Sequence, residues 1–136
     1  MPLPDFSLFE KQIGFTFADQ GLLVQALTHR SYLNESDQAG SGHNERLEFL
    51  GDAVLELIIT DYLYHKFPSK TEGDLTAYRA ALVNAEMLSS VAEAISVGDY
   101  LLLSRGEARD TGRARQSILA NTFEAIIGAL FLDQGY

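Results

Sequence analysis

Apolar residues recur every three or four positions along nearly the whole chain, and no long stretch alternates apolar with polar residues. The first spacing is that of one face of an α-helix, and the alternation that a half-buried strand would show is missing. The chain has 136 residues, of which 46% are hydrophobic, enough for one buried core. We therefore predict a single all-α domain spanning residues 1–136.

Breaks in this pattern divide the chain into helices. Gly14, Pro68 and Gly98 each stand where a helix is expected to stop. Thr71, with Asp74 three residues later, resembles a capping box that begins a helix. The predicted helices span residues 5–13, 19–30, 44–66, 71–97 and 116–133, with a polar loop at 34–43 and an arginine-containing loop at 104–115.

The predicted helix 44–66 carries its negative charge along one line. With an advance of about 100° per residue, Glu45, Glu48, Asp52 and Glu56 share a stripe roughly 80° wide. A solvated helix face is the ordinary explanation, but such a face usually mixes Lys with Glu, because like charges one turn apart repel. No Lys or Arg of this helix joins the stripe, so a bound cation is the alternative explanation.

The apolar residues of this helix fall into two groups, the expected core face and Phe49. The expected core face carries Leu47, Leu50, Val54, Leu57 and Ile58. Phe49 lies beside the carboxylates and off that face. It is either packed under a neighbouring helix, or exposed and covered by a second subunit.

The last predicted helix is apolar on nearly every side, apart from one stripe formed by Ser117, Asn121, Glu124 and Gly128. A glutamate on such a helix needs an ion pair, hydrogen-bond donors or a metal ion. If this stripe faces the first, several oxygen ligands converge. Oxygen ligation without cysteine suits a hard cation such as Mg²⁺ or Mn²⁺.

Charge and composition limit the classes of function. The net charge is −9, which disfavours nucleic-acid binding unless the charges are segregated or cations intervene. Four of the ten basic residues lie within eleven positions (Arg105, Arg109, Arg113 and Arg115). This cluster is either a solvated loop or a segment that binds phosphate.

There is no cysteine, no apolar run long enough for a membrane span and no recognisable signal peptide. We expect a cytoplasmic protein that does not bind membranes.

The segment NERLEFLGDAVL at 44–55 resembles the most distinctive motif of the ribonuclease III family. Three further segments follow the family's order and spacing: ALTHRSY at 26–32, EGDLTAYRAALVN at 72–84 and ILANTFEAIIGALFLDQGY at 118–136. The resemblance therefore covers nearly the whole chain. It implies the helical endonuclease domain of bacterial ribonuclease III, a homodimer that cuts double-stranded RNA in rRNA and mRNA processing. The products of that family carry 5′-phosphate and 3′-hydroxyl ends.

The resemblance also implies roles for individual residues. Glu48, Asp52 and Glu124 match the catalytic and Mg²⁺-binding acids, with Mn²⁺ as a possible substitute, and residue 121 matches a further metal ligand. Glu45 and Glu72 match a wider acidic cluster near the substrate, and Phe49 matches an aromatic residue of the dimer interface. In this context, Arg105, Arg109, Arg113 and Arg115 are expected to contact RNA phosphates. His29 is expected to be a hydrogen-bonded structural residue.

Two departures from the family pattern affect these expectations. The family usually has aspartate where this chain has Asn121; an amide oxygen still binds a cation but brings no charge, so we expect weaker Mg²⁺ binding. Bacterial members also usually continue into a double-stranded-RNA-binding domain, which these 136 residues do not include. Without that basic domain, RNA binding should be weak and salt-sensitive.

Three other interpretations remain open. One is a non-catalytic, RNA-binding scaffold of the same fold, although a pure binder has no reason to keep carboxylates that repel phosphate. Another is a small family member without the binding domain that acts on ribosomal RNA precursors. The last is an unrelated helical protein whose acidic face buffers cations.

Overall fold

The computed structural model describes residues 3–33, 42–109 and 111–136. Helices make up its regular structure, apart from an isolated parallel bridge between Thr28 and Leu102, so the predicted all-α class is confirmed for this part of the chain. The elements are α1 (Phe6–Ile13), α2 (Gln20–Ala26), α3 (Arg30–Leu33), α4 (Glu45–Lys66), α5 (Glu72–Leu82), α6 (Ala85–Ala94), the short 3-10 helix η1 (Val97–Asp99), α7 (Arg105–Arg109) and α8 (Arg113–Gln134).

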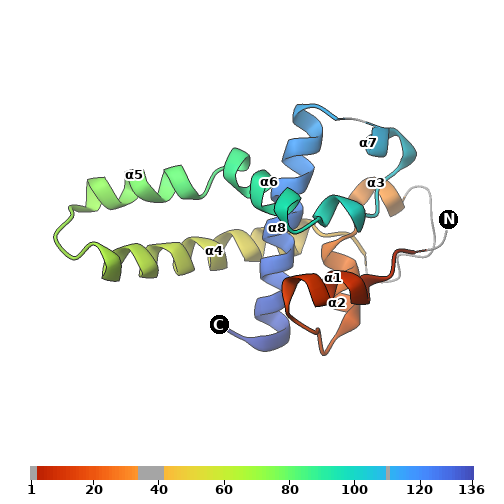
Figure 1. The fold of residues 1–136 in the computed structure, drawn as a ribbon, viewed down its shortest axis with the longest axis horizontal. Helices are drawn as coiled ribbons and strands as arrows, with labels where there is room; N and C mark the ends of the chain where they lie inside the picture. The colour runs from red at the N-terminus through yellow and green to blue at the C-terminus, as the bar shows by residue number, and fades with distance from the viewer. Residues whose placement is uncertain (1–2, 34–41, 110) are drawn as a thin grey trace.

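Helix α8 is the centre of the fold (Figure 1). It crosses the first half of α4 and packs along α6, while α1 and α2 lie beside its C-terminal half. The largest fully buried apolar side chains, Phe9, Leu23, Leu27 and Val97, come from α1, the α2 region and η1. They form one core against α8.

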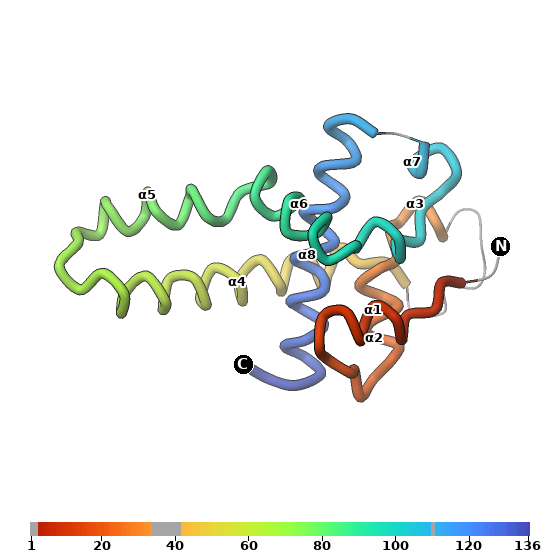
Figure 2. The backbone as a smooth tube through the Cα atoms, viewed as in Figure 1, coloured from red at the N-terminus to blue at the C-terminus, as the bar shows by residue number. Residues whose placement is uncertain are grey.

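Beyond this body, α4 and α5 project together as a two-helix arm (Figure 2). The arm explains an error in the predicted core face of α4. Val54 is buried, but Leu57 is 56% exposed and Ile58 is 37% exposed. Ile58 borders a surface pocket with Ile127 and Leu130 of α8, and beyond this point α4 extends away from the body beside α5. Leu55 is buried instead, in a small cluster with Leu88 and Ala120.

Side-chain caps set several helix ends. The Thr71 hydroxyl accepts a hydrogen bond from the Asp74 backbone N–H at 3.1 Å, as the predicted cap requires. The single helix predicted over 71–97 is wrong, since it breaks between Leu82 and Ala85. There the Asn84 side chain accepts from the Met87 N–H at 2.9 Å and begins α6. Asparagine favours this position because its side chain satisfies a helix N–H that has no partner within the helix.

Two more boundaries differ from prediction. The helix expected over 19–30 ends at Ala26, after which Leu27 accepts a hydrogen bond from the Leu102 N–H at 2.8 Å. The segment 104–115, expected to be a loop, contains α7 and the start of α8. Most of the polar loop expected at 34–43 lies outside the described residues. None of the described helices is both long and apolar enough to cross a membrane.

Candidate functional site

The crossing of α4 and α8 is a direct contact between helix backbones. A Cβ atom at Gly51 would lie 1.6 Å from the Glu124 carbonyl oxygen, and one at Gly128 would lie 2.3 Å from the Leu47 carbonyl oxygen. Only glycine fits at either position, because any Cβ there would overlap the other helix. This close approach places the residues around Gly51 directly beside those that precede Gly128 on α8.

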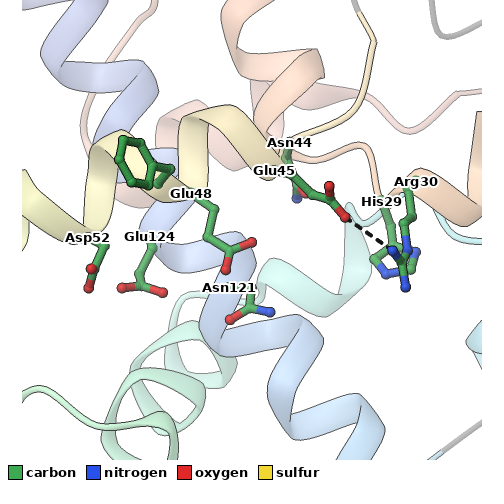
Figure 3. A pocket seen from close by; sticks show the side chains of 9 residues that line it. His29, Arg30, Asn44, Glu45, Glu48, Asp52, Asn121 and Glu124 are labelled. Carbon is green, nitrogen blue, oxygen red and sulfur yellow. Dashed lines mark hydrogen bonds and ion pairs between the residues drawn. The ribbon is translucent and has the colours of Figure 1, made fainter.

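Three of the four acids of the α4 stripe, Glu45, Glu48 and Asp52, consequently line one pocket together with Glu124 of α8, whereas Glu56 does not. The volume of this pocket is about 570 Å³ and its wall is formed by His29, Arg30, Asn44, Glu45, Glu48, Phe49, Asp52, Asn121 and Glu124. Figure 3 shows the ends of Asp52 and Glu124 next to each other, with Glu48 directed toward Asn121. The two polar stripes therefore face each other.

The carboxylates in this pocket are crowded and short of positive charge. Burial raises the pKa of Glu124 to about 8, and the hydrogen bond and charge of Asp52 and the charge of Glu48 act in the same direction. Burial also raises the pKa of Glu48, followed in effect by the charges of Glu45 and Asp52. The raised pKa favours retention of a proton on Glu124, which relieves part of the repulsion.

Whether these residues fit a metal ion depends on chemistry and arrangement. Three carboxylates and an amide oxygen are the ligand types that Mg²⁺ and Mn²⁺ prefer. Within residues 3–33, 42–109 and 111–136, no three acidic or histidine side chains are gathered as a ready-made metal-binding group. The donor set therefore fits a hard cation, although the described side chains do not already form a coordination group around one point.

Arginines from other helices do reach the two ends of the acidic stripe. The Arg30 Nη1 lies 3.4 Å from Glu45 Oε1, and the Arg79 Nε lies 3.6 Å from Glu56 Oε1. These solvent-exposed pairs contribute little to stability. Among the described residues, the ion pairs do not involve Glu48 or Asp52, the carboxylates in the middle of the stripe. The two ends of the stripe are therefore paired with arginines of α3 and α5, although no Lys or Arg of α4 itself joins it.

Glu72 does not line this pocket. It begins α5 at the far end of the arm (Figure 1). There it borders a separate pocket of about 420 Å³ whose other lining residues include Thr60, Tyr64 and Arg79. Within one chain, the α4–α5 hairpin therefore carries Glu72 away from the acidic cluster in which it was expected.

The four arginines expected to contact RNA lie on α7 and at the start of α8. Arg105, Arg109 and Arg113 have exposed side chains. Arg115 is half-buried, and its Nη2 would lie 2.8 Å from a Cβ on Gly98, so its guanidinium lies over η1. None of the four lines the acidic pocket.

Phe49 borders the acidic pocket but is 82% exposed. Of its two interpretations, packing under a neighbouring helix is thus excluded within the described chain. The arm exposes further large side chains, including Leu57 at 56%, Tyr62 at 53% and Tyr64 at 67%. An apolar surface of this kind is typical of a protein–protein contact.

Asn44 is a pocket residue for which the sequence analysis predicted no role in the site. It is 3% exposed, and its Nδ2 donates to the Ala26 carbonyl oxygen at 3.0 Å. Its backbone N–H donates to the Thr28 carbonyl oxygen at 3.0 Å. Asn44 thereby fixes the start of α4, and with it Glu45 and Glu48, to the end of α2. The sequence feature that could have indicated this role is its position directly before Glu45, the first residue of α4.

His29 is hydrogen-bonded, as expected. Its Nδ1 accepts from the Ser31 backbone N–H at 3.1 Å and lies 2.8 Å from the Ser31 hydroxyl. That hydroxyl accepts from the Ser104 N–H at 2.9 Å. Burial, the largest influence, lowers the pKa of His29. The sequence did not predict that His29 and Arg30 would form a wall of the same pocket as the acids.

Known proteins are similar to this chain in sequence and in fold. The family model described as "Ribonuclease-III-like" matches residues 19–136. The chain is 52% identical over 130 residues to Ribonuclease 3 of Bacillus cereus strain AH820; this match covers 96% of the chain and 53% of the relative. The chain thus spans about half the length of the curated relatives it matches.

Solved structures agree with this similarity. The nuclease domain of ribonuclease III from Campylobacter jejuni, described as having a region involved in dimer formation, superposes with a TM-score of 0.86 at 43% identity, over 96% of this chain and 87% of that one. Dicer from Pichia stipitis gives a TM-score of 0.66 at 31% identity, over 99% and 50% of the two chains. With its sequence and fold in agreement, the chain belongs to the ribonuclease-III-like family.

Proposed function

We propose that this chain is the catalytic domain of an endoribonuclease that hydrolyses phosphodiester bonds of double-stranded RNA. The activity depends on Mg²⁺, or on Mn²⁺ in its place, and leaves 5′-phosphate and 3′-hydroxyl ends. The observation that carries the proposal is the group of three carboxylates, Glu48, Asp52 and Glu124, brought together from two helices without a compensating cation. Membership of the family supplies the reaction class.

The metal would be held by Glu48, Asp52 and Glu124 together with the Asn121 amide oxygen. Bound there, a divalent ion supplies an activated water and stabilises charge on the reacting phosphate and on the leaving oxygen. The protein positions these groups through the close crossing of α4 and α8. The raised pKa of Glu124 favours its protonated form when no cation is present, so binding a cation as an anionic ligand releases that proton.

We further propose that the domain acts as a homodimer. The support is the exposed Phe49 together with the exposed apolar side chains of the arm, and the dimer-forming region described for the Campylobacter nuclease domain. A second subunit would cover this surface. It would also give Glu72, which is remote from the acids of its own chain, a way to reach the acidic cluster of a partner.

Contacts with the RNA duplex complete the proposal. The exposed Arg105, Arg109 and Arg113 are suited to phosphate contacts that follow the shape of the duplex rather than its sequence. Arg115 is less available because it packs over η1. Processing of rRNA and mRNA precursors in the cytoplasm is the role that we assign on the basis of the family.

A non-catalytic RNA-binding domain is the second candidate. Asn121 favours it, because an amide in place of a carboxylate leaves the pocket with one negative charge fewer for a cation. The retained acids oppose it, since Glu48, Asp52 and Glu124 would repel phosphate in a protein that only binds RNA.

Cleavage of an end-labelled, fully paired RNA duplex at low salt tests the proposal. The chain is incubated with Mg²⁺, with Mn²⁺ or with EDTA, beside a Glu124→Gln variant and a Glu86→Gln control on the exposed face of α6. We expect metal-dependent cutting by the parent and by Glu86→Gln, and none by Glu124→Gln. A folded parent that binds the duplex but does not cut it with either metal would contradict catalysis and favour the binding domain. Restoring Asp at position 121 then shows whether that residue disabled the site.

A further inference from the structure

One wall of the acidic pocket is formed by His29 and Arg30, which are hydrogen-bond donors, whereas the carboxylates elsewhere in the pocket are acceptors. A phosphate group entering this pocket meets carboxylates on α4 and α8, which repel it in the absence of a cation. At the other end, Arg30 and His29 offer N–H donors. Arg30 pairs with Glu45 at 3.4 Å, and both side chains are mostly exposed, so this weak pair can open to a competing anion.

The hydrogen bonds of His29 determine which ring nitrogen carries the proton and can act as a donor. A backbone N–H can only donate, so the 3.1 Å contact from Ser31 makes Nδ1 an acceptor. The neutral ring must then carry its proton on Nε2. Among the described residues, no hydrogen bond to Nε2 is found, although the side chain lines the pocket.

The ring is also held firmly in place. The His29 backbone N–H donates to the Leu102 carbonyl oxygen at 3.0 Å, in the bridge between residues 28 and 102. The Ser31 hydroxyl joins His29 Nδ1, at 2.8 Å, to the Ser104 N–H, at 2.9 Å. Two segments of the chain, residues 28–31 and 102–104, therefore hold the imidazole in place, and a donor fixed in advance loses little entropy when it binds a ligand.

We propose that the Nε2–H of His29 donates a hydrogen bond to a non-bridging phosphate oxygen of the RNA strand that lies in this pocket. This inference rests on the proposed function, because it assigns a phosphate contact at the same site. The phosphate concerned lies on the Arg30 side of the bond that is cut. His29 is thus a substrate-binding residue that aligns the strand, and Arg30 contributes the neighbouring charge.

Two substitutions separate this contact from the structural role of the ring. In His29→Asn, the side-chain oxygen can accept from the Ser31 N–H in an Asx-turn, which keeps the local structure, but nothing replaces Nε2–H. In His29→Gln, the longer side chain brings an amide N–H near the place of Nε2 and loses the acceptor at the place of Nδ1. His29→Asn therefore removes the donor and keeps the acceptor, and His29→Gln does the reverse.

The first readout is binding of a fully paired RNA duplex in EDTA at low salt, beside thermal unfolding of each variant. We expect His29→Asn to melt close to the parent and to bind about tenfold more weakly, as loss of a hydrogen bond to a charged group would give. His29→Gln should melt lower but keep most of the affinity. With metal, His29→Asn should raise KM by a similar factor and leave kcat nearly unchanged, because the contact is present before and during the reaction.

The salt dependence of binding identifies the type of contact. A neutral donor displaces no counterion, so His29→Asn should leave the slope of log affinity against log salt concentration unchanged. Arg30→Gln should flatten that slope by about one, as the loss of one charged phosphate contact does. A slope that changes equally in both variants would contradict a neutral donor at His29.

The other outcomes are also decisive. If His29→Asn binds and cleaves like the parent, or if both His29 variants lose affinity only in proportion to their loss of stability, the phosphate contact is refuted. If the parent binds duplex RNA but cuts it with neither metal, the proposed catalysis fails. In that case the binding comparison still tests His29 by itself.

Discussion

Replacing Gly51 by alanine should disrupt the crossing that creates the pocket. The added Cβ would lie 1.6 Å from the Glu124 carbonyl oxygen, whereas ordinary contact begins at 3.4 Å. The two helices must therefore separate locally by well over 1 Å. Because the obstacle is backbone rather than a flexible side chain, relaxation has to move α8 or α4 as a whole.

The expected loss of stability follows from two opposing effects. Overpacking a core costs about 1–3 kcal/mol, and more where the structure cannot relax. Alanine recovers about 1 kcal/mol through its higher helix propensity. Because the obstacle at Gly51 is backbone, the cost lies at or above the top of that range. The net loss should then be about 2 kcal/mol or more, which lowers the melting temperature of a domain of this size by roughly 6 °C or more.

Thermal unfolding followed by circular dichroism measures this effect, with Gly106→Ala as the matched control. Gly106 is also helical, but a Cβ there meets nothing within 4 Å, so that variant should melt at or slightly above the parent temperature. Gly51→Ala should also lose divalent-cation binding, since Asn121 and Glu124 move with α8. If Gly51→Ala and Gly106→Ala melt within about 2 °C of each other, the backbone contact does not constrain the crossing.

Three further predictions concern buried polar groups. Since the pKa of Glu124 lies at about 8 rather than 4.5, the folded chain keeps a proton that the unfolded chain releases, and metal-free stability falls as the pH rises from 4.5 to 8. Glu124→Gln should match the parent near pH 4.5 and exceed it by about 1–2 kcal/mol at pH 8 after solvent screening is allowed for; equal differences at both pH values in urea titrations would contradict this. Thr122→Val should raise stability by about 1 kcal/mol, because the Thr122 hydroxyl is buried without a hydrogen-bond partner among the described residues and leaving such a group unpaired is costly; a lower melting temperature would show that it has a partner. Asn44→Ala should cost about 1–3 kcal/mol by leaving the Ala26 carbonyl oxygen unpaired, and denaturant unfolding with no change in midpoint would count against it.

The features that sequence predicted well are local ones. Glu48 and Asp52 are four residues apart, so any helix through them places both on one face. Thr71 and Asp74 form a cap within a single turn, and the structure shows that bond. The same reasoning failed at Asn84, where apolar residues continue on both sides and concealed a cap that starts a new helix.

Features that depend on distant segments could not be predicted in the same way. The meeting of Asp52 with Glu124 requires α4 and α8 to cross at Gly51 and Gly128, and glycine spacing within one helix does not reveal its partner. Leu57 was expected in the core because its helix position is right, but the arm leaves it exposed. The location of Glu72 at the end of that arm and the link from His29 through Ser31 to Ser104 likewise depend on the folded chain.

The roles of the pocket residues remain predictions, and direct measurement of cation binding tests them best. Calorimetric titration of Mg²⁺ and of Mn²⁺ would compare the parent with Glu124→Gln, Asn121→Asp and the remote control Glu86→Gln. We expect the parent and the control to bind with proton release at pH 7, because Glu124 is protonated there without metal. Asn121→Asp should bind more tightly, and Glu124→Gln should lose both binding and proton release. Equal binding by the parent and Glu124→Gln would contradict the account, since the cation would then not be held at the crossing of α4 and α8.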